Sequence, residues 1–357
     1  MPDLRARTEV SGVAELSATL EVLRSSSEDA LRSASEIARR YVIAGYRIEL
    51  RFAGPALLPA IEPAFAHHAE FGPHDGVDLT VSVWDSASTG VALPPIPWVD
   101  APAGHEKEIR IRSGAGLRAV HRMDEGDLSL LDEGNDVAFM WIPDASDVPF
   151  DVYGAPLRMI LLWWMRLHDL HLIHAAAVGT QTGGVLIPGS GGSGKSTTAL
   201  ACVLGGLRYA SDDHVLLDVR EEPFAHSLYA TGKLQPRHAE RFPDLAAQLR
   251  PPLGPDEKAL LFLNEFEPAA PIPGFPLRAV VAPKIVDGVG ARVVPISRGR
   301  ALATLAPSTI LSLPGARGAG FPAMTELVAS VPSYVLEIGS DLSAIAPAVL
   351  GLLEELR

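Results

Sequence analysis

The chain has 357 residues, a formal net charge of −13 and 47% hydrophobic residues, so it is long and apolar enough to fill the cores of two domains. Its apolar run MILLWWM, at residues 159–165, is too short to span a bilayer, and the charged start MPDLRARTEV lacks a secretory signal pattern, so we expect a cytoplasmic protein without a membrane partner. The single cysteine, Cys202, excludes an internal disulfide and is expected to be a small buried residue.

The charge is distributed unevenly along the chain. Residues 1–150 contain 24 acidic and 13 basic residues, whereas residues 151–357 contain 19 and 17, which gives net charges of −11 and −2. An acidic field repels nucleic acid, and the chain has no basic stripe or nucleic-acid-binding motif, so we expect no nucleic-acid partner. The acidic part favours a basic peptide partner, or is simply a solvated surface.

The first 150 residues predict an N-terminal α+β domain. Helical periodicity over residues 13–45 indicates one or two amphipathic helices, with a break near Ser26, Ser27 and Glu28. A Pro- and Gly-rich loop is expected over residues 88–105. Short alternating strands are expected at residues 46–52, 78–84, 108–112, 117–121 and 137–142.

A histidine-rich segment in this first part suggests a metal site only weakly. His67, His68 and His74 lie near Glu70, but a second set of ligands at regular offsets is missing. We therefore expect these histidines to be exposed to solvent, and we find no catalytic spacing in residues 1–150.

Residues 151–357 predict a second domain with a layered α/β core. A helix over residues 155–170 is followed by strands at 172–179 and 184–189, a helix at 195–206 and a strand at 214–218. Alternation of helices and strands is typical of such a layered core.

A phosphate-binding loop joins the second of these strands to the following helix. Gly189, Gly194, Lys195 and Ser196 satisfy the pattern G-x-x-x-x-G-K-[ST] between an apolar strand and an Ala/Leu-rich helix. Glycines let successive N–H groups point at phosphate oxygens, Lys195 is expected to reach the β- and γ-phosphates, and the Ser196 hydroxyl to bind Mg²⁺. The residues expected to contact the nucleotide are Gly189, Ser190, Gly191, Gly192, Ser193, Gly194, Lys195, Ser196 and Thr197.

An acidic pair follows the loop, in the stretch ASDDHVLLD at residues 210–218. Asp212 and Asp213 precede the apolar strand, whereas a motor protein or GTPase has its metal-binding aspartate at the end of one, so this order argues against those classes. The pair is suited to a second Mg²⁺ contact and a general base. His174, alone beside alanines, is by itself more typical of a core residue than of a functional one.

The segments IHAAAVG (173–179) and GGVLIPGSGGSGKSTTALACVLGGLRYASDDHVLL (183–217) together resemble the HPr kinase/phosphorylase family and its related branch. The resemblance implies an α/β P-loop kinase domain of the HPr kinase/phosphoenolpyruvate carboxykinase-like type, with ATP and Mg²⁺ as cofactors. It implies that Asp212 accepts the proton of the acceptor hydroxyl, that His174 tunes or orients Asp212, and that Asp213 and Ser196 hold Mg²⁺.

A basic loop of this family suggests further contacts. Lys233, Arg237 and Lys258 are candidates for γ-phosphate or substrate contact, the alternative being ordinary surface charge. Thr197 stands where HPr kinases have an acidic residue, and the segment after residue 258 lacks the Arg- and Gly-rich signature associated with HPr docking. We therefore do not expect HPr as the acceptor or phosphorolysis as an activity.

The sequence thus predicts a kinase that transfers the γ-phosphoryl group to a Ser or Thr hydroxyl of a peptide or protein. Members of the related branch often lie among genes for ribosomally made peptides, including lasso peptides, which implies a precursor peptide as substrate. A small-molecule kinase for an alcohol or amino acid, and a nucleotide-gated binding protein without transfer, remain alternatives. Relatives are often homo-oligomers, but the chain has no heptad seam, and ATP is not distinguished from GTP.

Overall fold

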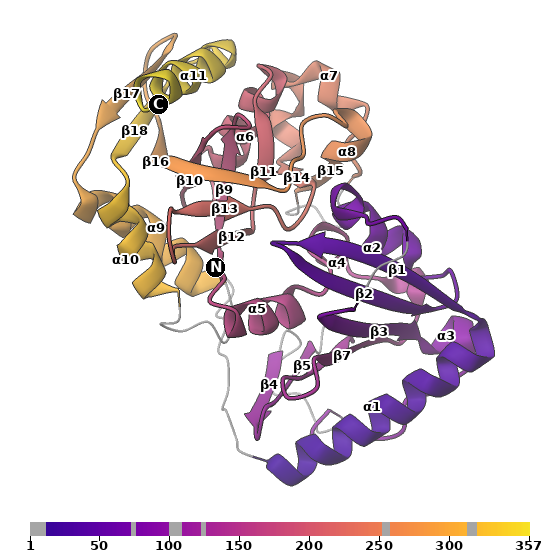
Figure 1. Ribbon diagram of the computed structural model, residues 1–357. Coiled ribbons are helices and arrows are strands. Elements are labelled where there is room, and N and C mark those ends of the chain that lie inside the picture. Colours follow the sequence, from indigo (N-terminus) through magenta and orange to yellow (C-terminus); the bar gives the residue numbers. More distant parts are fainter. Residues whose placement is uncertain (1–11, 73–75, 100–108, 123–125, 252–257, 313–319) are drawn as a thin grey trace. The chain divides into compact units, whose positions relative to one another are not determined.

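Figure 1 shows the computed structural model, which describes residues 12–72, 76–99, 109–122, 126–251, 258–312 and 320–357. The chain forms two compact units: one extends to His168 but excludes Pro63–His67, and the other contains that segment and the chain from Asp169 onward. The boundary between the units, after His168, lies further along the chain than the boundary expected at 150/151. The reason is that α5 (Arg158–Leu167) contacts β6 (Leu128–Asp132) and Trp164 Nε1 donates a hydrogen bond to Asp136 Oδ1 at 2.8 Å.

The first unit is an α+β arrangement, as expected. Its mixed sheet has the strand order β1-β2-β3-β7-β6-β5-β4, and the apolar face of α1, with Leu16, Leu20 and Leu23, packs in one core with Trp84 and Leu130. The elements of this part of the chain are α1 (Val13–Ala34), β1 (Glu36–Ile43), β2 (Tyr46–Ala53), α2 (Leu58–Phe65), η1 (Ala66–His68), β3 (Leu79–Asp85), α3 (Ser86–Thr89), β4 (Ile109–Gly114), β5 (Leu117–Arg122), β6, β7 (Val137–Ile142), η2 (Ala145–Asp147), α4 (Phe150–Gly154) and α5.

The expected helix over residues 13–45 is wrong in its second part. Helix α1 runs without a break to Ala34, and Ser35, with a φ of 63°, ends it. The next residues form β1, which pairs antiparallel with β2 through a two-residue turn at Ala44 and Gly45, both with positive φ. Pairing with β2 outweighs the local helical periodicity, because a hairpin satisfies the backbone and buries alternate side chains.

The expectation of solvent-exposed histidines is also wrong for His68, which is 4% exposed. His67 is half-buried, and its Nε2 lies 2.7 Å from Ser227 Oγ. Within the described ranges, no group of three or more His, Cys, Asp or Glu residues is arranged to hold a metal ion. His74, Glu108 of one expected strand and residues 100–105 of the expected loop lie outside the described residues.

The second unit is a mixed α/β structure built on one large sheet, with a separate two-stranded sheet of β14 and β15. The strand order of the large sheet is β11-β9-β10-β16-β13-β12-β8, with β18 pairing with both β16 and β17. The strand expected over residues 172–179 is two strands, which part at His174. The elements are β8 (His171–Ile173), β9 (Ala175–Gly179), β10 (Gly184–Pro188), α6 (Lys195–Leu204), β11 (Arg208–Ser211), β12 (Val215–Asp218), β13 (Phe224–His226), β14 (Thr231–Leu234), η3 (Pro236–Arg241), α7 (Pro243–Ala246), β15 (Ala259–Phe262), α8 (Leu263–Phe266), β16 (Gly274–Ile285), β17 (Ala291–Pro295), α9 (Arg298–Ser312), α10 (Phe321–Ser330), β18 (Ser333–Ile338), η4 (Leu342–Ala344) and α11 (Ile345–Glu355).

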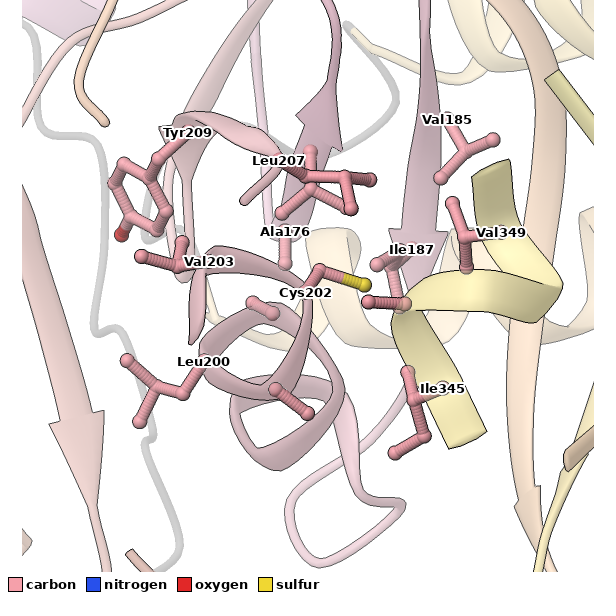
Figure 2. Close-up of a cluster of buried hydrophobic side chains, with 14 of the residues drawn as sticks. Ala176, Val185, Ile187, Leu200, Cys202, Val203, Leu207, Tyr209, Ile345 and Val349 are labelled. Atoms are coloured by element: carbon pink, nitrogen blue, oxygen red, sulfur yellow. The ribbon is translucent and has the colours of Figure 1, made fainter. Parts of the chain in front are cut away.

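Helices cover both faces of this sheet, so the unit has three layers. Along β10, Val185 and Ile187 join the core that includes α6 and α11, whereas Leu186 joins the core that includes α9 and α10. Figure 2 shows the first of these cores, in which Cys202 of α6 lies among apolar side chains. Cys202 is fully buried, which confirms the sequence prediction, and burial raises the pKa of its thiol to about 12.

The apolar run at residues 159–165 is explained by burial in the first unit. Met159 to Met165 are all buried side chains of α5. Over the described part of the chain, no helix combines the length and the apolar character that are needed to cross a membrane.

Candidate functional site

The glycine loop between β10 and α6 forms the floor of a pocket of about 420 Å³ in the second unit. Gly194 is the N-cap of α6 with a φ of 97°, and its carbonyl accepts a hydrogen bond from Thr198 N at 2.8 Å. A side chain at Gly189 would place Cβ 2.2 Å from Ser193 Oγ, so the close approach of these residues requires glycine. The first turn of α6, with its N–H groups and positive dipole end, therefore faces the pocket and suits an anion.

Basic side chains gather around this floor. Lys195 is 5% exposed, and burial lowers its pKa, an effect that Asp213 and Asp212 oppose. The pocket is also lined by Lys258 and by Arg237, His238 and Arg241. In a chain with a net charge of −13, this local excess of positive charge favours a polyanionic ligand.

Behind Lys195 lies a cluster around Asp213, which follows β11. Nζ of Lys233 lies 3.0 Å from Asp213 Oδ2, Nε2 of His174 lies 2.6 Å from Oδ1, and Nδ1 of His214 lies 3.8 Å from Oδ2. Burial alone would raise the pKa of Asp213, but Lys233, His214, His174 and Lys195 together hold it well below its usual value. Asp213 is therefore ionised at neutral pH.

The same geometry locates a proton on His174. Its Nε2 lies 2.6 Å from Asp213 Oδ1 and 2.9 Å from Lys195 Nζ, and one ring nitrogen cannot donate and accept at once. Because Asp213 is ionised, we infer that Nε2 carries the proton and donates a hydrogen bond to Asp213 Oδ1. Lys195 Nζ then has no acceptor on the nearby His174 Nε2, its contact to Asp213 Oδ1 is long at 3.5 Å, and its ammonium group is available to a phosphate.

Asp212 differs sharply from its neighbour. It is 1% exposed, and its Oδ2 accepts a hydrogen bond from the backbone N of Lys233 at 2.8 Å. Its Oδ1 is buried without a hydrogen-bond partner in the described part of the chain. Burial raises the pKa of this carboxyl group, although Lys258 and Lys195 oppose the effect. An ionised oxygen without a donor is a strong proton acceptor.

Helix α9 holds His174 in place. His174 lies between β8, which pairs with β12, and β9, which pairs with β10 and β11. Its backbone N donates to Thr309 Oγ1 at 3.2 Å, and its carbonyl accepts from Ser308 Oγ at 3.4 Å. These bonds satisfy the backbone where the two strands separate, so the imidazole can turn toward Asp213.

The structure brings most of the residues expected from the sequence into one region. The pocket is lined by His174, Ser190, Gly191, Gly192, Gly194, Lys195, Ser196, Thr197, Arg237 and Lys258. Among the described residues, Asp212, Asp213 and Lys233 lie behind this lining rather than in it: Asp213 contacts Lys195 and His174, and Lys233 binds both aspartates. Lys233, expected as a phosphate or substrate contact, thus forms an ion pair with a carboxylate in this state.

Sequence reasoning missed several members of the site. His238 and Arg241 lie on η3 with Arg237, and the three-residue spacing of His238 and Arg241, which places them on one face of a 3₁₀ helix, was the available signal. Ile285, Ile338 and Leu342 line the pocket from elements far along the chain, and no local pattern marks them. His214 and Thr309 act on Asp213 and His174 only through the fold.

The oxygen donors fit Mg²⁺ bound together with a nucleotide. Mg²⁺ in proteins takes one or two carboxylate or hydroxyl oxygens and completes its coordination with phosphate and water. Ser196 lines the pocket, Asp213 is ionised, and the unpartnered Oδ1 of Asp212 is a further oxygen donor nearby. Because no cluster of three carboxylates or histidines forms among the described residues, the fit depends on phosphate oxygens.

Comparisons with known proteins leave the family open. No family model matches the chain, and no curated protein matches it. A solved structure that resembles it is the Hpr(Ser) kinase/phosphatase from Coxiella burnetii, with 12% sequence identity and a TM-score of 0.29 over 52% of this chain and 92% of that chain.

Proposed function

We propose that this chain is an ATP- and Mg²⁺-dependent kinase that transfers the γ-phosphoryl group to a Ser or Thr hydroxyl. The observation that carries the proposal is the contact between the glycine loop and a carboxylate pair. Lys195 of the loop lies 3.5 Å from Asp213, and Oδ1 of the adjacent Asp212 is buried without a hydrogen-bond donor among the described residues. The sequence resemblance to the HPr-kinase-related branch supports the same reaction.

In this proposal Asp212 is the general base. The acceptor oxygen forms a bond to the γ-phosphorus, its proton moves to Asp212 Oδ1, and the bond from the γ-phosphorus to the β–γ bridging oxygen breaks to leave ADP. The hydrogen bond from Lys233 N fixes Oδ2 and leaves Oδ1 for the proton. Since Asp212 is 1% exposed, the proposal requires nucleotide binding to draw Lys195 toward the phosphates and open a path to the carboxylate.

The remaining residues neutralise and position charge. Ser196 and Asp213 would hold Mg²⁺, which when bound neutralises the phosphate charge. Lys195 and Lys258 reach the phosphates from the pocket lining, and His174 keeps Asp213 oriented through its Nε2 proton. Positioning and charge neutralisation are the main requirements of phosphoryl transfer.

We propose that the phosphate acceptor is a peptide, such as a ribosomally made precursor peptide. The excess of acidic residues in residues 1–150, at a net charge of −11, supports a basic peptide partner. Affinity for such a peptide should fall steeply as salt rises. Affinity that is unchanged between low and high salt contradicts this part of the proposal.

The test is a transfer assay with γ-labelled ATP, Mg²⁺, Ser- and Thr-containing peptides, and a panel of free amino acids and alcohols. We expect one phosphoryl group on a peptide hydroxyl, lost in Lys195→Ala and in Asp212→Asn, whereas Asp212→Asn keeps its affinity for ATP. Asp218→Asn, a carboxylate of the same unit that pairs with Arg220, is the matched control and should transfer normally. If the label appears only in small molecules, the acceptor is a small molecule and not a peptide. If Asp212→Asn transfers phosphate normally, Asp212 is not the general base.

A further inference from the structure

One wall of the pocket is apolar: Ile338 belongs to the core beside α6 and Leu342 packs against that core, whereas the side chain of Ile285 is exposed. Ile285, at the end of β16, is 65% exposed and lines the pocket together with Ile338 and Leu342. Ile285 pairs in register with Ile338 of β18, and its Cγ1 would lie 3.9 Å from a Cβ on Gly194. An exposed isoleucine beside the phosphate-binding loop thus extends the floor of the pocket as an apolar surface, which we call the apolar corner (Ile285, Ile338, Gly339 and Leu342).

The apolar corner is built rigidly. Val286 N donates to Ile338 O at 3.0 Å, Gly339 N to Gly290 O at 2.9 Å, and Asp341 N to Val289 O at 2.8 Å. The side chain of Asp341 accepts from the backbone N and the hydroxyl of Ser343. These N–H groups and the Asp341 carboxylate are therefore engaged in hydrogen bonds of the corner itself, and its side chains offer a ligand an apolar surface.

The side of the pocket opposite the apolar corner is polar and carries basic side chains. In Figure 1, β17, β18 and α11 lie on one side of α6, whereas α7 and the paired strands β14 and β15 lie on the other. Arg237, His238 and Arg241 line the pocket from η3, which directly precedes α7, and Asp212 is bonded to β14 through Lys233. Positive charge and the carboxylate pair are thus on the side away from the apolar corner.

We propose that the apolar corner receives the base of the nucleotide and does so without distinguishing adenine from guanine. The inference rests on the proposed function, because it takes the phosphates to lie on the loop. The base then packs on Ile285 and Leu342, and the phosphate chain crosses the first turn of α6 toward Lys195 and the aspartates. The corner presents apolar side chains, and the N–H groups of Val286, Gly339 and Asp341 beside it already donate to backbone carbonyls, so we expect ATP and GTP to bind alike. Selectivity for one purine arises where a site pairs hydrogen-bonding groups with it.

The test compares ATP, GTP and inorganic tripolyphosphate by equilibrium binding to the full chain. Ile285→Ser is the test variant, and Val289→Ser is its control, because Val289 is 71% exposed in the same β16–β17 connection but does not line the pocket. Ile285→Ser should weaken ATP and GTP about equally, by roughly tenfold, and leave tripolyphosphate unchanged, since only the base loses apolar contact. Val289→Ser should change none of the three affinities.

Each other outcome contradicts a specific part of this proposal or of the proposed function. Unchanged ATP affinity in Ile285→Ser, or equal weakening of tripolyphosphate, removes the corner as the base site. A wild-type preference of more than about tenfold for ATP or GTP overturns the lack of discrimination. If the wild-type protein binds tripolyphosphate and ATP equally, the corner fails while phosphate binding stands; if it binds none of the ligands, the proposed function itself fails.

Discussion

At the scale of single residues, two adjacent carboxylates have opposite environments. Asp213 is surrounded by the basic groups of Lys233, His174 and Lys195, which keep its pKa low, whereas burial raises the pKa of Asp212. Pairs of titratable groups whose pKa values are driven apart are suited to different tasks in one reaction. The structure thus separates a group that stays charged from a group that can take up a proton.

The environment of Asp212 predicts a stabilising substitution. A carboxyl group with a raised folded-state pKa makes its ionised form a cost to the folded state at pH values above the unfolded-state pKa. Asp212→Asn removes that charge and keeps an acceptor for Lys233 N, so the free energy of unfolding at pH 7 should rise by about 0.5–2 kcal/mol while transfer is lost. Denaturant unfolding measures it, with Asp218→Asn as control.

Asp218 suits that comparison because its hydrogen bonds from Arg220 lower its pKa. Its loss should leave stability unchanged or reduced. A destabilised Asp212→Asn variant would mean that attraction from Lys258 and Lys195 outweighs the cost of burial.

Lys233 predicts a pH-dependent effect of the opposite sign. The lowered pKa of Asp213 stabilises the fold above the unfolded-state pKa near 4, and this contribution is lost as the pH falls through the folded-state value. Lys233→Met removes the 3.0 Å ion pair but keeps the backbone bond to Asp212, so it should lower the free energy of unfolding by about 1–3 kcal/mol at pH 7.

The loss in Lys233→Met should shrink as the pH falls below about 4, because Asp213 is then protonated in the unfolded and, progressively, in the folded state. Lys233→Arg, which keeps the charge, is the matched control and should lose less. Unfolding measured at several pH values tests this, and a loss that is independent of pH would assign the role of Lys233 to packing of its methylene groups instead.

At the scale of elements, what the sequence could predict was local. The loop and the start of α6 follow from Gly189, Gly194 and Lys195, because glycine spacing and a helix N-terminus are encoded within a few residues. The hairpin of β1 and β2 was missed although Gly45 marked a turn, since the helical periodicity of residues 36–43 competed with it. The separation of β8 from β9 at His174 was beyond local patterns, because it is decided by β12 and α9.

Helix α9 therefore predicts a positioning residue far along the chain from the loop. Thr309→Val removes the acceptor for His174 N and keeps the side-chain shape, so His174 should hold Asp213 less firmly. We expect kcat to fall by about tenfold, with the KM for ATP nearly unchanged. Thr304→Val, on the exposed part of the same helix, bonds only to Arg300 O within α9 and is the control.

The position of the proton on the His174 ring can be measured separately from kcat, by NMR of the ring nitrogens. The chemical shifts of the His174 ring nitrogens should change in Thr309→Val and not in Thr304→Val, because the geometry around Nε2 is altered. Thr309→Ser, which keeps a hydroxyl as acceptor for His174 N, should keep kcat near the wild-type value. A variant that loses only thermal stability, with kcat and the ring signals unchanged, would limit Thr309 to a structural role.

At the scale of the whole molecule, the two units have separate cores, and the described residues that line the pocket all belong to the second unit. Leu23 of α1 is fully buried in the first unit, so Leu23→Ala should lower that unit's stability by about 2–5 kcal/mol. Affinity for ATP, titrated below the unfolding temperature, should be unchanged, while phosphorylation of a peptide should weaken if the acidic unit binds it. Calorimetry and titration measure both. A parallel loss of ATP affinity would show that the pocket depends on the first unit, and the separation of binding from recognition would be wrong.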